Sequence, residues 1–190
     1  MACKIIAPFR DCPNELANAV FKIQEAVAAT AVVDAIYPLV QAARRNGKDG
    51  KPITYPRLSL IESDKVVEQD MFPGKKLESS YAFFEMLSDV VVADGLESIS
   101  YTLGLVFFMT APDNCGPEVC LETVTDARSK VFNAIVNLTE VSGVRMEMRI
   151  SRVWGEYTYT IMDFGQFQHP HYTFKITFTV NEDYDCCQIC

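Results

Sequence analysis

Apolar residues recur at intervals of three and four in the first third of the chain, where alanine is also abundant. The positions that set this rhythm are Leu16, Val20, Ile23 and Val27. This spacing places them on one face of a helix. We therefore predict a helix over residues 13–46, capped by Asn14 or Asp11 and ended or kinked at Pro38.

Further along the chain the period changes. Residues 46–76 are rich in proline and glycine and predict a loop, one or two short strands and another loop. Residues 97–109 alternate between apolar and polar positions and turn apolar on both sides near Phe108, which predicts a central strand. Residues 122–140 carry a second helical stripe, closed by Gly143.

The last third of the chain alternates with period two, which is typical of half-buried strands. The predicted strands cover residues 144–154, 157–164 and 171–180. On 171–180 the alternate residues Tyr172, Phe174, Ile176, Phe178 and Val180 form the apolar face, and Thr173, Lys175, Thr177 and Thr179 form a wet face.

This order of elements predicts the α+β class. The expected architecture is an antiparallel sheet of about four to five strands, with the long N-terminal helix and the second helix packed on one face. We expect a single domain over 1–190: an N-terminal arm at 1–12, the helix at 13–46, an α+β core at 47–181 and a C-terminal tail at 182–190.

Composition narrows the class of protein. With 49% hydrophobic and 22% charged residues among 190, the chain is expected to fold, and its apolar stretches are too short to span a bilayer. The first 20 residues do not resemble a signal peptide, so the seven cysteines are interpreted as reduced thiols. A net charge of −8 argues against a large nucleic-acid-binding surface, although a ring through which DNA passes stays compatible with it.

Two groups of residues are candidates for a metal site. The pair Cys187 and Cys190 has the spacing of half a zinc site, and Cys115 with Cys120 could supply the other half. His169 and His171 could ligate a metal together with Asp163. The simpler interpretation of each group is free thiols and a turn before the last strand.

Other motifs point to no known chemistry. Residues 187–190 have the outline of a prenylation box, but the segment before them is acidic rather than basic. The Asp163–Gly165 tripeptide lacks every other kinase motif, and neither a phosphate loop nor a nucleophile elbow is present. We therefore predict that the protein is not an enzyme and assign no catalytic, cofactor-binding or metal residue.

Four segments together resemble the tail-terminator and tail-completion proteins of tailed bacteriophages. They are "SSYAFFEML" at 79–87, "ISYTLGLVFFM" at 99–109, "DARSKVFNAIVNL" at 126–138 and "YTFKITFTVNEDYDCCQI" at 172–189. The resemblance implies a structural virion protein, assembled in the host cytoplasm, that forms a hexameric ring where the tail meets the head.

Several expectations follow from that resemblance. The partners would be copies of the chain and the neighbouring tail-tube or connector proteins, and DNA would pass through without specific binding and without any membrane. The loops at 47–57 and 110–121 are where we expect contacts between subunits. The alternative is a small metal-binding protein or metalloenzyme that uses His169, His171 and the C-terminal cysteines.

Overall fold

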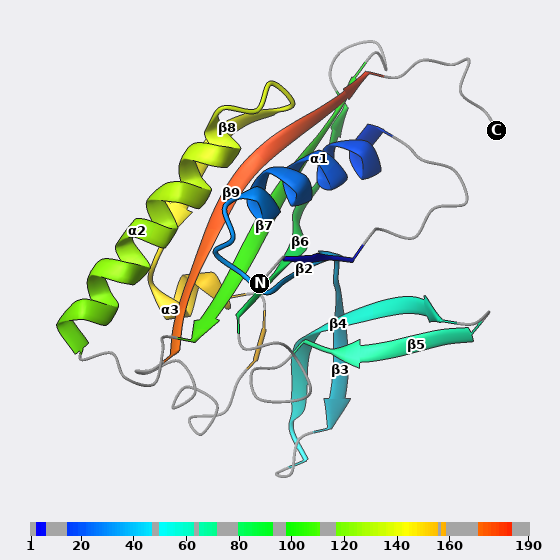
Figure 1. Cartoon of the computed structure of the whole chain (residues 1–190). Coiled ribbons are helices and arrows are strands. Elements are labelled where there is room, and N and C mark those ends of the chain that lie inside the picture. Colours follow the sequence, from blue (N-terminus) through cyan, green and yellow to red (C-terminus); the bar gives the residue numbers. More distant parts are fainter. Residues whose placement is uncertain are drawn as a thin grey trace.

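The structure is a computed structural model (Figure 1). It describes residues 3–6, 15–46, 50–62, 65–71, 80–92, 98–110, 117–155, 157–158 and 171–183. The predicted strand at 157–164 falls mostly outside these ranges. Helices and sheets both occur, so the α+β class is confirmed.

The larger sheet, sheet A, has six strands in the order β1-β2-β6-β7-β9-β8. Their bounds are Lys4–Ile5 for β1, Ala35–Leu39 for β2, Tyr81–Val92 for β6, Ser98–Thr110 for β7, Val141–Glu147 for β8 and His171–Asp183 for β9. The pairs β1-β2 and β2-β6 are parallel, and the other three pairs are antiparallel. The prediction of a purely antiparallel sheet of four to five strands was therefore wrong.

The first helix, α1, spans Glu15–Ala29, so the prediction of a helix over 13–46 was also wrong. The helix ends in a turn, in which the N–H groups of Thr30 and Ala31 bond the carbonyls of Val27 and Ala28 and Ala31 has a φ of 54°. The chain then enters β2, where Ile36 and Tyr37 are buried on opposite faces of sheet A. A segment buried on both sides favours a strand over a surface helix.

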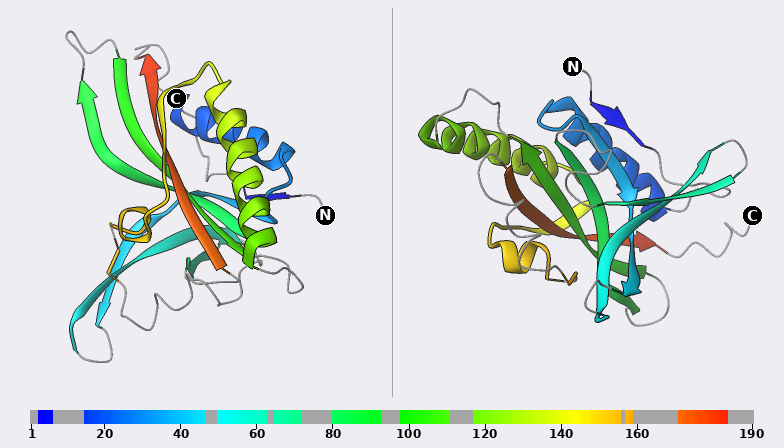
Figure 2. Two further views of the ribbon diagram at one scale, coloured as in Figure 1. Left: turned by 90° about the vertical axis from the view of Figure 1, so that its left-hand side faces the viewer. Right: turned by 90° about the horizontal axis from the view of Figure 1, so that it is seen from below.

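The second helix, α2, spans Pro117–Val136 and lies beside α1 on one face of sheet A (Figure 2). The predicted helical stripe is buried there, at Val124, Ala127, Val131 and Ile135. The helix was predicted over 122–140 with Gly143 as its end. Instead Gly143 lies inside β8 with a φ of 62°, at an irregularity in the pairing with β9.

The opposite face of sheet A is covered by a second apolar cluster. It includes Phe83, Phe108 and Trp154, and the short helix α3 (Ile150–Val153) packs there. The predicted strand over 144–154 stops at Glu147, because the Glu147 carboxylate accepts the N–H groups of Met148 and Arg149 and the chain turns into α3. This cluster also buries Thr173, which the sequence placed on a wet face.

A second sheet, sheet B, has three antiparallel strands in the order β3-β4-β5. They are Gln41–Asn46, Pro52–Glu62 and Lys65–Asp70. We call the described residues of 41–71 the arm, because in Figure 1 and in the left view of Figure 2 these strands extend away from sheet A and its helices. The interpretation of 46–76 as loops with one or two strands located β4 and β5 but missed β3.

Candidate functional site

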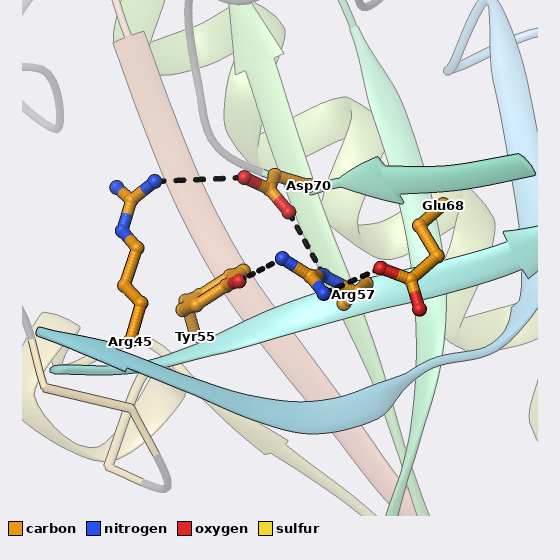
Figure 3. A network of polar contacts seen from close by, with 5 residues as sticks. All are labelled: Arg45, Tyr55, Arg57, Glu68 and Asp70. Atoms are coloured by element: carbon orange, nitrogen blue, oxygen red, sulfur yellow. Dashed lines mark hydrogen bonds and ion pairs between the residues drawn. The ribbon is translucent and has the colours of Figure 1, made fainter.

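One face of the arm carries a network of charged and aromatic side chains from all three strands (Figure 3). Asp70 accepts a hydrogen bond from Arg57 Nε at 3.1 Å and lies 3.6 Å from Arg45 Nη1. Arg57 also bonds Glu68 at 2.5 Å and the hydroxyl of Tyr55. Two guanidinium groups thus face two carboxylates, and the network balances its own charge.

Tyr55 is the centre of this network and is fully buried. The guanidinium carbons of Arg45 and Arg57 lie 4.9 Å and 5.1 Å from the centre of its ring. Burial lowers the pKa of Arg57, but the hydrogen bond that Arg57 donates to Asp70 and the nearby Tyr55 and Glu68 outweigh it and leave that pKa raised. Cation–π and ionic contacts therefore hold the three strands in register on this face.

The other face of the arm is attached to the body at its base. Leu58 and Met71 are fully buried in the second apolar cluster, on the face of sheet A opposite α1 and α2. The N–H of Thr158 donates to the carbonyl of Thr54 at 2.8 Å. Toward the far end of β4 and β5 this cover is lost, and Val66 and Val67 are 67% and 38% exposed.

The arm leaves sheet A at Val40, whose N–H donates to the carbonyl of Phe84 at 2.8 Å. Up to this point β2 pairs with β6, and its last partner there is Phe84. Beyond it, β2 continues into β3 and joins sheet B instead. Among the described residues no strand pairs with Glu85–Val92 on the side that β2 has left.

The space between the departing strand and β6 is a cavity of about 420 Å³. We call it the fork. Its lining comes from both diverging strands and from one residue after α3: Leu39, Val40, Gln41, Ala42, Glu85, Met86 and Tyr157. Met86 is 39% exposed at this position.

A buried ion pair lies beside the fork. Lys175 Nζ on β9 is 2.8 Å from Glu85 Oε1 on β6, and the two side chains are 7% and 3% exposed. The pair crosses the strand between them at Gly104, where an added Cβ would lie 2.9 Å from Glu85 Oε1. A glycine at this point of β7 is what allows the two side chains to meet.

The residues proposed from sequence as metal ligands are not brought together within the described structure. His171 begins β9, with its Nδ1 3.1 Å from Thr110 Oγ1 and its ring stacked on Phe108. The backbone of Cys120 belongs to α2. Cys115, Asp163, His169, Cys187 and Cys190 lie outside the described residues, and within those ranges no three His, Cys, Asp or Glu residues cluster.

Sequence reasoning missed both polar features. Glu85 and Lys175 are 90 positions apart, and Lys175 alternates with threonines as a solvent-facing residue would. The available signal was Gly104, an isolated glycine inside a strong strand pattern, which indicates a close approach. Residues 52–57 of the loop proposed at 47–57 belong to β4 instead. Of the loop proposed at 110–121, residue 110 ends β7, 117–121 belong to α2, and 111–116 lie outside the described residues.

Comparison with known proteins leaves the chain without an established relative, because no family model, curated protein or solved structure matches it. No helix among the described residues is long and apolar enough to cross a membrane.

Proposed function

We propose that this chain is a non-enzymatic structural protein of a tailed bacteriophage virion. It forms a homomeric ring, hexameric by the resemblance in its sequence, at the head–tail junction or on the tail. There it ends the tail tube and joins it to the connector. DNA passes through the ring without specific binding, which suits a chain with a net charge of −8.

The arm is the observation that carries this proposal. β3 and β5 are largely exposed, and each has one edge without a partner strand among the described residues. Soluble proteins avoid unpaired edges on extended strands, because they invite pairing with another chain. When copies of the chain repeat around an axis, a neighbouring subunit can cover these exposed edges.

Light scattering and negative-stain microscopy of the purified, reduced protein test the proposal. We expect a discrete mass that is a multiple of 21.3 kDa, and rings in the images. A chain that stays monomeric and shows no rings at high concentration contradicts it.

A further inference from the structure

The fork and the arm present two free strand edges on one chain. β5 pairs with β4 on one side only, and β6 pairs with β7 alone from Glu85 to Val92, among the residues that the structure describes. The two cannot meet within one molecule, since the arm and the far half of β6 point in different directions (Figure 2, left). Each edge is thus open to a second copy.

We propose that β5 of one subunit adds to the free edge of β6 in the next subunit, so that the arm occupies its neighbour's fork. This inference rests on the proposed ring. Six residues of β5 extend over about 20 Å, and the open length Glu85–Val92 is sufficient to pair with all of them. The added strand satisfies backbone N–H and C=O groups on both edges.

Apolar exposure supports the same pairing. Among the described residues, the exposed large hydrophobic side chains are Val66, Val67, Met86, Val136 and Met148. Two of these five lie on β5 and a third lines the fork. Val66 and Val67 are neighbours in the strand and point to opposite faces, so one of the two valines lies on the same side of the joined sheet as Met86. Contact between that valine and Met86 gives the pairing an apolar centre.

The balance of charged residues also differs between the arm and the rest of the chain, and this difference supports the same contact. Residues 41–71 contain six Lys or Arg and five Asp or Glu, whereas the remaining sequence contains 11 and 20. The arm is thus slightly basic on an acidic protein. A copy of the acidic body attracts it, while two bodies repel each other, which favours arm-to-body contacts.

The contact is head-to-tail, because the donor strand and the acceptor edge are different surfaces. Such a contact forms a closed ring when the rotation between neighbours returns to the start. It also predicts that each subunit has two separable contact surfaces, the β5 edge that donates a strand and the β6 edge that accepts one.

Two variants disrupt these two contact surfaces one at a time. Val66→Asp with Val67→Asp places carboxylates on β5, and Met86→Asp places one in the fork. The control is Val136→Asp with Met148→Asp, which adds the same charges at exposed apolar positions outside both surfaces. Circular dichroism and the midpoint of thermal unfolding establish that each variant folds.

We expect the control to assemble like the wild type and both test variants to be monomers in light scattering. Mixed together, the two test variants should form a dimer and no larger species. The intact arm of the Met86 variant enters the intact fork of the valine variant, and neither end can then extend. A misfolded variant would not form this dimer.

The outcomes separate this inference from the ring itself. If the wild type assembles and either test variant still assembles, or if the mixture stays monomeric, the arm-to-fork contact is wrong while the ring proposal stands. If the wild type is monomeric at every concentration, both are wrong.

Discussion

Replacing Lys175 by Met tests whether the buried ion pair with Glu85 holds the middle of sheet A together. The two charges are 2.8 Å apart and almost fully buried. At an effective dielectric constant of about 20 their attraction is about 6 kcal/mol, which the cost of removing both from water largely offsets. Removing only Lys175 leaves the carboxylate buried without its counter-charge, so we expect a loss of about 3–5 kcal/mol.

The pair differs from a hydrophobic contact in its response to a second change. Glu85→Leu alone should also destabilise the protein, because it leaves the ammonium group buried. In the combined Glu85→Leu, Lys175→Met variant no buried charge is left, and we expect stability within about 1–2 kcal/mol of the wild type. The single changes are thus strongly non-additive.

Urea denaturation of the wild type and the three variants measures these free energies of unfolding, at two protein concentrations so that assembly is distinguished from folding. Lys130→Met is the matched control. Lys130 lies 2.7 Å from Asp126, at a similar distance but exposed, and its loss should cost less than about 1 kcal/mol. A Lys175→Met cost no larger than this control, or a double variant as unstable as the sum of the two single ones, refutes the reasoning.

Three further predictions concern single positions. Gly104→Ala should lower the free energy of unfolding by about 1–3 kcal/mol in urea denaturation, because its Cβ would lie 2.9 Å from Glu85 Oε1. Tyr81→Phe should leave stability unchanged or raise it by up to about 1 kcal/mol, since the buried Tyr81 hydroxyl has no hydrogen-bond partner among the residues that the structure describes; a loss above that value contradicts this. Glu140 accepts a hydrogen bond from Lys22, which lowers the pKa of Glu140. The stabilisation from this contact is therefore present above the ordinary glutamate pKa and is lost as the pH falls through the lower pKa of the folded state. Glu140→Gln should therefore flatten the fall in stability on acidification, measured as the thermal midpoint between about pH 5 and 3.

The elements that could be predicted from sequence are those whose apolar residues keep a clear period over much of their length. Leu16, Val20, Ile23 and Val27 are all buried against sheet A, and the strand expected at 97–109 is β7 at Ser98–Thr110. In such elements the period of the apolar residues reports the local structure directly. The strand expected at 171–180 likewise begins at His171 and continues to Asp183.

The segment from 30 to 46 could not be predicted in this way. Alanine favours a helix locally. β2 is fixed instead by its parallel pairing with β6, which begins where Ala35 lies opposite Tyr81. β2 has only five residues and is buried on both faces, so no period is visible in it. The arm and the fork both follow from where β2 leaves β6, so they too were hidden from sequence reasoning.

The continuity of β2 with β3 also has a mechanical meaning. A pull on the arm along β3 is transmitted through Val40 into β2, whose four paired positions with β6 are aligned with the load. These hydrogen bonds are then strained together in shear rather than opened one after another from an end. An arm that bears tension between neighbours is therefore anchored through β2, the second strand from one edge of sheet A.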